Sequence, residues 1–229
     1  MQRKSVVFLV YPNVTQLDLT GPAQVLSRLP DARVDLVWKS RDPVQTDSGF
    51  ALLPTATLGE VAQTDILCIP GGFGCVDVMH DDETLAWVRR LGGAAQWVTS
   101  VCTGSLILGA AGLLRGYRAT SHWAWRDDLK LFGAEPVRER VVFDRNRVTG
   151  GGVTAGIDFA LALMAKIQGE DYAKTVQLGL EYDPHPPFDC GTPDKADLEL
   201  VKRVHQRSNR MAPDREERVR AAAERFARQ

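Results

Sequence analysis

The sequence lacks a strong charge of either sign, and it lacks a long hydrophobic run. Its 28 Lys and Arg residues nearly balance its 29 Asp and Glu residues, for a net charge of −1. Nothing in this balance indicates a nucleic-acid partner, since such partners usually select a basic surface. Only about seven apolar residues precede Pro12, too few for a secretory signal and far too few to cross a bilayer. We expect a protein that binds neither nucleic acid nor membrane.

Cysteine is also scarce, and its four positions lack the spacing of a metal site. Cys68, Cys75, Cys102 and Cys190 form no C-x-x-C pair, and no Cys/His arrangement predicts a zinc site. Cys68 falls in a strand pattern and Cys102 in a tight turn. We therefore expect reduced thiols in a cytoplasmic protein rather than two disulfides.

Short apolar segments alternate with segments of helical pattern, which is typical of a mostly parallel sheet with helices on both faces. Strands are predicted at 5–11, 33–40, 65–70, 96–101, 118–120, 138–143 and 147–149, with a hairpin over 44–53. Helices are predicted at 21–29, 82–91, 104–111, 123–131, 155–169 and 173–180. In this scheme Asp18 lies in a loop, Gly21-Pro22 opens the first helix, and Ser121 caps the helix that begins at Trp123.

A Pro-rich stretch at 181–192 precedes a polar C-terminal segment. Thr192-Pro193-Asp194 predicts a helix start, followed by helices at 195–206 and 214–228 that break at Pro213. We interpret these helices as a solvated or subunit-packing tail, because they lack a clear helix-turn-helix pattern for reading DNA. The domain prediction is an α/β domain over 1–192, with 193–229 as a helical extension of the same domain.

Cys102 is the residue whose surroundings indicate chemistry most directly. It lies in Thr99-Ser100-Val101-Cys102-Thr103-Gly104-Ser105, where an apolar strand turns through small residues into a helix. This is the pattern of a nucleophile elbow, a sharp strand-to-helix turn that lifts one side chain above the sheet edge. The helix start favours thiolate over thiol, which makes Cys102 the candidate nucleophile. A buried structural cysteine is the alternative.

Asp18 is the candidate proton donor. It follows the first predicted strand between two leucines, and a desolvated carboxyl group has a raised pKa. A neutral carboxyl can hydrogen-bond a thiolate and donate a proton during a reaction. The alternative is that Asp18 caps the helix start at Thr20-Gly21, and the two roles can coexist.

Two glycine-rich turns also follow predicted strands, and the carboxyl ends of parallel strands meet at one edge of the sheet. Gly71-Gly72 allows backbone N–H groups to approach a reacting centre, although a plain tight turn explains the pair equally well. Gly150-Gly151-Gly152 places Val153 against a ligand, with a nucleotide-binding turn as the competing interpretation. Thr103 offers its hydroxyl or N–H beside the sulfur.

No histidine is paired with Cys102 in the sequence, since Thr103 follows it. His80 and His205 fall in surface segments and His185 in the Pro-rich loop. His122, in Ser121-His122-Trp123, has the one plausible route to the sheet edge. We interpret it as structural, with a place at the site as the alternative.

Together these segments resemble the superfamily of PfpI-type peptidases and parkinsonism-associated deglycases, which is class I glutamine amidotransferase-like. The resemblance covers roughly residues 5–190 and implies a flavodoxin-like three-layer sandwich with a cysteine on the nucleophile elbow. The supporting stretches are Gln16-Leu17-Asp18-Leu19-Thr20-Gly21-Pro22, Cys68-Ile69-Pro70-Gly71-Gly72, Thr99 to Ser105, Ala119-Thr120-Ser121-His122-Trp123 and Thr149 to Phe159.

Within this superfamily, Asp18, Cys102 and Thr103 are most similar to the pattern of the isocyanide hydratases. Peptidases and deglycases have Glu where Asp18 stands, and the peptidases follow the cysteine with His. The resemblance implies a lyase that adds water to an isocyanide through a thioimidate on Cys102, with Asp18 as proton donor. It also implies a homodimer, no metal or organic cofactor, and a pocket framed by Thr103 and by the substrate-binding residues Gly71, Gly72 and Val153.

Two other functions stay open. Sensor domains of AraC-type regulators carry a similar Cys-Thr-Gly elbow and Ser/Thr-His-Trp run, so a stand-alone ligand- or redox-sensing domain is one alternative. A glyoxalase-like enzyme acting on small dicarbonyls is the other.

Overall fold

The computed structural model describes residues 4–228, and within that range it confirms the α/β prediction. Its main sheet has seven strands in the order β10-β11-β7-β6-β1-β2-β5. Neighbouring strands are parallel except for β10 and β11. The strands are β1 Ser5–Leu9, β2 Arg33–Trp38, β5 Ala56–Thr57, β6 Ile66–Ile69, β7 Trp97–Val101, β10 Val141–Asp144 and β11 Arg147–Gly150.

Two short strand pairs lie outside this sheet. The predicted hairpin is present, since β3 (Val44–Gln45) pairs antiparallel with β4 (Ala51–Leu52). The other pair is parallel and joins β8 (Arg118–Ala119) to β9 (Glu135–Pro136).

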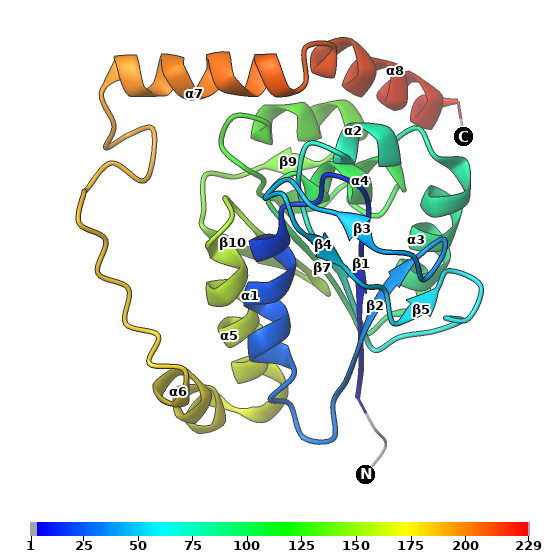
Figure 1. Ribbon diagram of the computed structural model, residues 1–229, viewed down its shortest axis with the longest axis vertical. Helices are drawn as coiled ribbons and strands as arrows, with labels where there is room; N and C mark the ends of the chain where they lie inside the picture. The colour runs from blue at the N-terminus through cyan, green and yellow to red at the C-terminus, as the bar shows by residue number, and fades with distance from the viewer. Residues whose placement is uncertain (1–3, 229) are drawn as a thin grey trace.

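Helices cover both faces of the sheet (Figure 1). On one face α1 (Gln16–Leu26) packs on α5 (Ala155–Gln168), which in turn packs on α6 (Glu170–Gly179). On the other, α4 (Gly104–Ala110) contacts α3 (Asp82–Ala94) and the short α2 (Cys75–Val78). The central strands are almost entirely buried, which explains their unbroken apolar sequences. The result is the flavodoxin-like three-layer sandwich.

Helix α1 begins at Gln16, so the prediction of a helix opening at Gly21-Pro22 is wrong. These two residues lie inside the helix, where α1 crosses α5. A Cβ on Gly21 would lie 3.1 Å from Ile157 Cγ1, and one on Gly156 would lie 3.0 Å from Pro22 Cδ. Close helix packing therefore explains the Gly-Pro pair, and the earlier helix start puts Asp18 in the first turn of α1 rather than in a loop.

Two other predicted helix starts also differ. The predicted helix after Ser121 is instead a 3-10 helix, η1 (Arg126–Phe132), which Ser121 does not cap. Near Thr192 the chain forms a turn that is not continued, in which the Ala196 N–H donates to Thr192 O over 3.0 Å. Helix α7 (Leu198–Met211) begins later, because the Asp197 side chain caps it by accepting from the Leu200 N–H at 2.8 Å.

Helix α8 (Arg215–Ala227) lies across one end of the sandwich beside α2 and η1 (Figure 1). Its Val219, Ala222 and Phe226 are buried, and the Phe226 ring lies 6.1 Å from that of Phe132. We propose on this packing that residues 193–229 extend the α/β domain rather than form a separate unit.

Phe226→Ala should lower the free energy of unfolding by about 3 kcal/mol, because it removes a buried ring and leaves a cavity. Thermal or urea denaturation measures this. Leu178→Ala is the matched control, since Leu178 is 82% exposed and its loss should change stability by less than about 0.5 kcal/mol. Equal effects of the two substitutions would contradict the docking of α8 on the core.

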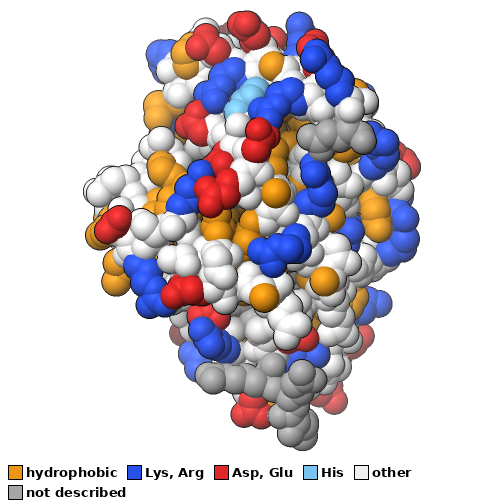
Figure 2. All heavy atoms as spheres, turned by 90° about the vertical axis from the view of Figure 1, so that its right-hand side faces the viewer, with side chains coloured by type: hydrophobic (Ala, Val, Ile, Leu, Met, Phe, Trp, Pro, Cys, Tyr) orange, Lys and Arg blue, Asp and Glu red, His pale blue; other side chains and the backbone are white. Residues whose placement is uncertain are grey.

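Among residues 4–228, none of the helices has the length and apolar content needed to cross a membrane. Figure 2 shows acidic and basic side chains interspersed over one face of the molecule. Of the eight large hydrophobic side chains that are exposed among the described residues, five belong to the C-terminal part of the chain (Leu178, Phe188, Leu198, Val204 and Met211), and the others are Phe50, Leu53 and Leu131.

Candidate active site

Cys102 occupies a strained turn between β7 and α4, as the elbow prediction required. Its φ is +54°, in the left-handed region, which costs a non-glycine residue about 1–2 kcal/mol. The Cys102 N–H donates to Gly150 O and Gly151 O at 3.1 and 2.7 Å. Its carbonyl accepts from the hydroxyls of Ser105 and Ser121 at 3.0 and 2.8 Å. Both sides of the elbow are thus fixed by hydrogen bonds.

The strand register brings the predicted segments together at one edge of the sheet. Ile69 at the end of β6 pairs with Ser100 in β7, and Val101 at the end of β7 pairs with Gly150 in β11. The loop after β6 therefore lies beside the elbow, with the turn after β11 on its other side. The predicted convergence of Cys102, Gly71-Gly72 and Gly150 to Gly152 is confirmed.

Asp18 is fully buried and faces the loop after β6. Its Oδ2 accepts from the Gly71 N–H at 2.8 Å, while Oδ1 has no hydrogen-bond partner among the described residues. Burial raises the pKa of Asp18 to about 8, and the Asp47 charge raises it too, while hydrogen bonds from Gly71 and Cys102 lower it. The predicted rise in pKa is confirmed. The proposed cap at Thr20-Gly21 is wrong, because no helix begins there.

Gly71 is the point where the acid, the thiol and Thr103 meet. A Cβ on Gly71 would lie 2.6 Å from Thr103 N, 2.7 Å from Asp18 Oδ2 and 2.8 Å from Cys102 Cβ. Real Cβ atoms do not approach other atoms so closely. The absence of a side chain at Gly71 therefore allows Asp18 and Cys102 to approach the same piece of backbone.

Gly71→Ala should destabilise the protein by about 1–3 kcal/mol, because the added methyl group overpacks three fixed neighbours. Thermal denaturation measures the loss. Gly191→Ala is the control, since a Cβ on Gly191 meets no atom within 4 Å. If Gly71→Ala is as stable as Gly191→Ala, the tight approach described above is wrong.

Thr103 is held by the second glycine of the same turn. Its Oγ1 accepts from the Gly72 N–H at 2.9 Å and donates to Gly72 O at 3.1 Å. Gly72 has a φ of +132°, and a Cβ there would lie 2.4 Å from Asn13 O, so only glycine fits. The N–H groups of Gly71 and Gly72, predicted to face a reacting centre, instead hold Asp18 and Thr103 in place.

The ionisation of Cys102 differs from the sequence-based expectation. Burial raises its pKa well above the usual thiol value, and the Asp18 carboxylate raises it further. The Thr103 N–H and hydroxyl lower it, but they do not offset burial of a residue that is 6% exposed. The helix start alone therefore does not keep the thiol ionised. Asp18 and Cys102 instead form an acid pair that holds both protons at neutral pH and releases the first near pH 8.

A cleft of about 700 Å³ adjoins the elbow, and its wall includes Ser121 and Gly151, which bond the Cys102 backbone. Val153, His122 and Trp123 also line it. Burial lowers the pKa of His122 to about 4, so its ring is neutral at pH 7 and is not a cationic partner for a thiolate.

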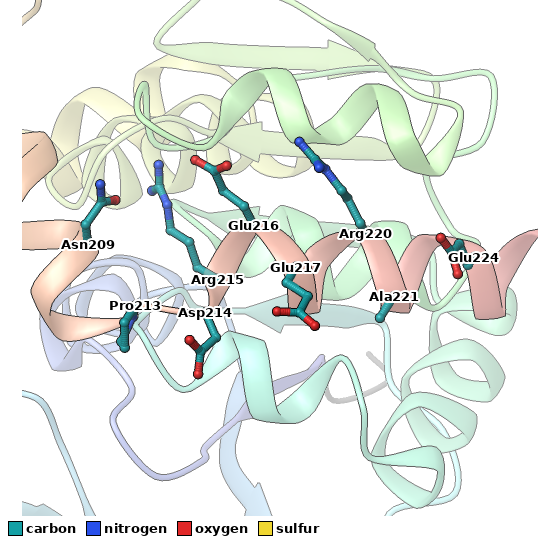
Figure 3. Close-up of a pocket in the computed structure, with 9 residues that line it drawn as sticks. All are labelled: Asn209, Pro213, Asp214, Arg215, Glu216, Glu217, Arg220, Ala221 and Glu224. Atoms are coloured by element: carbon teal, nitrogen blue, oxygen red, sulfur yellow. The ribbon is translucent and has the colours of Figure 1, made fainter.

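A second hollow, of about 890 Å³, lies along α8 and the turn before it (Figure 3). Figure 3 shows Glu216 and Arg220 on one side of the helix and Asp214 and Glu217 on the other. These are charged surface side chains rather than a nucleophile with a base. No group of three or more His, Cys, Asp or Glu within residues 4–228 is arranged to hold a metal ion.

Sequence analysis missed Tyr11, whose hydroxyl donates to Pro70 O at 2.8 Å and so fixes the residue before Gly71. Nothing in an apolar strand ending in Tyr distinguishes this role from ordinary core packing. Ser121 was predicted to cap a helix, but its hydroxyl instead donates to the carbonyl oxygen of Cys102 in the elbow.

Comparisons with known proteins identify the family of this chain. The DJ-1/PfpI family model matches residues 4–166. An isonitrile hydratase from Pseudomonas putida is 53% identical over 201 residues, which cover 88% of each chain. The crystal structure of a THiJ/PfpI family protein from Pseudomonas syringae superposes with a TM-score of 0.91 at 44% identity, covering 97% of this chain and 91% of that one.

A transcriptional regulator of the HTH type, CdhR from Pseudomonas aeruginosa, is 30% identical over 138 residues. That match covers 58% of this chain and 40% of the regulator, so it involves less than half of the regulator's length. The family match spans most of the chain and includes the acid, the glycine turn and the elbow. This protein belongs to the DJ-1/PfpI family.

Proposed function

We propose that this protein adds water to isocyanides, which are also called isonitriles, and releases N-substituted formamides. The extensive match to an isonitrile hydratase supports this activity. The structural observation that carries the proposal is the buried Asp18 carboxyl, neutral below about pH 8, beside the elbow cysteine. An isocyanide carbon needs a nucleophile and a proton, and Cys102 and Asp18 supply one of each.

The shape of the site also suits this substrate. Cys102 is 6% exposed, so a ligand must present a narrow end to the sulfur. The N≡C group is linear and ends in the reacting carbon, whereas a dicarbonyl carries an oxygen beside its reacting carbon. We assign the substituent on the isocyanide nitrogen to the cleft lined by His122, Trp123 and Val153.

The reaction begins when the pair holds one proton and that proton is on Asp18. The Cys102 thiolate attacks the terminal carbon, Asp18 protonates that carbon, and a thioimidate forms. Water then adds to the same carbon and gives one proton back to Asp18. The remaining hydroxyl proton moves to nitrogen as the carbon–sulfur bond breaks. The products are a formamide, the thiolate and the protonated acid, so the cycle is closed.

Thr103 and the glycine turn support these steps. The Thr103 N–H and hydroxyl both stabilise negative charge on the sulfur. Gly71 aims the Asp18 carboxyl by donating its N–H, and Gly72 fixes the Thr103 hydroxyl. We propose that Val153 packs against the substrate substituent at the cleft.

The pH dependence of kcat/KM should show an acid limb near pH 8. Below this value the pair holds two protons and no thiolate is present, so kcat/KM should fall about tenfold for each pH unit. Initial rates of formamide formation from pH 5 to 10 measure this limb. A flat profile between pH 5 and 8 would contradict a raised pKa in the reacting pair.

The activity is tested by incubating the protein with a simple alkyl or aryl isocyanide and following the formamide proton by NMR. Mass spectrometry of quenched samples should show a transient adduct, with the mass of one isocyanide, on the Cys102 peptide. Methylglyoxal is assayed in parallel. Turnover of methylglyoxal but not of the isocyanide would favour the glyoxalase-like alternative.

A ligand- or redox-sensing role is the second candidate, and the match to part of a regulator supports it. It predicts saturable isocyanide binding without formamide, or ready oxidation of Cys102 to the sulfinic acid. Formamide formation at a rate that saturates with substrate would exclude sensing as the sole role.

We also propose a homodimer that works in the cytoplasm. Five large hydrophobic side chains between Leu178 and Met211 are at least 40% exposed, and exposed apolar patches are typical of contact surfaces. All four cysteines are free, which suits a reducing compartment. Sedimentation equilibrium should give about twice the chain mass of 25.2 kDa.

A further inference from the structure

Helix α7, to which the proposed reaction gives no role, contributes to the wall of the cleft beside the elbow. Val201 and His205 of this helix line the cleft, as do residues 191–194 of the loop before it. The rest of the wall comes from the segments 120–128, 138–140 and 151–154. The cleft is therefore bounded by both the α/β body and the C-terminal segment. The family match ends at residue 166, so the wall that α7 supplies lies beyond it.

The spacing of the side chains on α7 determines which of them face the body. Val201, His205 and Ser208 lie four and three residues apart, which places them on one side of a helix. Ser208 is buried and the other two are partly buried, whereas Gln206 is exposed. Helix α8 follows directly and packs on the core through Phe226, so α7 is held in place at its C-terminal end.

Aromatic rings form the contact between α7 and the body. The His205 ring meets the Trp123 ring edge to face, with centroids 4.9 Å apart and an interplanar angle of 87°. The His122 ring lies 5.4 Å from the same indole and is tilted by 31°. All three side chains line the cleft and are only partly buried, so part of their surface is open to a ligand. A planar aromatic group packs well against rings arranged in this way.

We propose that Val201 and His205 determine which isocyanides the protein accepts. The substituent on the isocyanide nitrogen is an aromatic group that packs against Trp123 and His205, and Val201 limits its size. This inference rests on the proposed function. The residues that hold the Cys102 backbone belong to the same cleft wall, so an isocyanide whose carbon meets the sulfur has its substituent in the cleft. Helix α7 thus selects the substituent and takes no part in the chemical steps.

The first test compares kcat/KM for benzyl isocyanide and methyl isocyanide, which share the reacting group and differ in the ring. Val201→Trp should lower the benzyl value about tenfold or more and leave the methyl value within about twofold, as is typical of size discrimination in a pocket. His205→Ala should lower the benzyl value about fivefold, as expected for loss of one aromatic contact. Gln206→Trp is the matched control, because it adds the same indole at an exposed position of α7 and should change neither value.

The second test needs no turnover, so it separates failure of this inference from failure of the hydratase activity. N-phenylmaleimide and iodoacetamide both alkylate a cysteine sulfur, and only the first carries a ring. Val201→Trp should slow the reaction of N-phenylmaleimide with Cys102 about tenfold and leave that of iodoacetamide unchanged. Peptide mass spectrometry separates Cys102 from the exposed Cys190.

The inference is overturned if Val201→Trp affects benzyl and methyl isocyanide equally or affects neither, or if His205→Ala leaves the benzyl value unchanged. If the protein turns over no isocyanide, the alkylation test decides alone. Discrimination between the two reagents by Val201→Trp then supports α7 as the selecting wall, and its absence overturns that assignment. Val201→Phe replaces Val201→Trp if circular dichroism shows that the latter does not fold.

Discussion

Cys102→Ala should abolish formamide production, with a fall in kcat/KM of roughly 10⁴-fold or more. The reaction needs a sulfur anion that forms and later breaks a bond to carbon, and no other described cysteine lies on the elbow. Cys102→Ser should be nearly as inactive, because a hydroxyl group is far less acidic than a thiol. Initial rates at pH 8 over a range of isocyanide concentrations, from well below to above KM, measure the loss.

The Cys190→Ala variant is the control for this loss. Because Cys190 is exposed, the variant should retain full activity. The isocyanide adduct should disappear from the Cys102 peptide in both Cys102 variants. Retention of more than about one per cent of the native rate by Cys102→Ala would mean that the nucleophile is a different group or that water attacks directly.

Asp18→Asn should lower kcat/KM by about 10²- to 10⁴-fold and, at the same time, make the protein more stable. The amide has no acidic proton for the isocyanide carbon, although its oxygen still accepts from the Gly71 N–H. The stabilisation follows from the pKa of Asp18, which is about 8 in the folded protein and near 3.8 ordinarily. Activity and stability should therefore change in opposite directions.

The sign of the stability effect depends on pH. Below pH 3.8 the carboxyl is protonated in both states and native stability is highest with respect to this group. As the pH rises toward 8, the unfolded chain loses this proton while the folded chain keeps it, so stability declines. Asparagine at position 18 does not ionise, so the stability of the variant does not decline with pH for this reason. Its advantage should be on the order of a few kcal/mol at pH 7, several degrees in Tm, and near zero at pH 3.5.

Thermal denaturation of the two proteins at pH 3.5 and pH 7 checks this prediction. An advantage of the same size at both values would show that Asp18→Asn acts by packing rather than by ionisation. A less stable variant at pH 7 would mean that the Asp18 carboxyl is not desolvated in solution.

Local sequence predicted the elbow and the acid, because both depend on near neighbours. Small residues around Cys102 are needed for a sharp turn, and two leucines beside Asp18 indicate burial. The start of α1 was mispredicted because Gly21-Pro22 serves the contact with α5, which only the folded chain shows. The partners of the Gly71 and Gly72 N–H groups likewise depend on residues 53 and 31 positions away in sequence.

The ionisation of Cys102 was mispredicted for a different physical reason. A helix start was expected to favour the thiolate, and this expectation ignored how deeply the elbow lies. With the residue 6% exposed, desolvation outweighs the helix, the Asp18 charge raises the pKa of the thiol further, and only the Thr103 N–H and hydroxyl favour the thiolate. Local motifs therefore predicted which residues meet, while burial determined their protonation.

The left-handed backbone at Cys102 has a consequence for adaptation to heat. Glycine at position 102 would relieve the backbone strain, and asparagine at position 18 would remove the cost of a buried acid. A lineage selected for thermal endurance alone would drift toward these two inert replacements. A homologue from a hot environment that retains both the cysteine and the aspartate should therefore still be a catalyst, because selection for stability alone would have removed them.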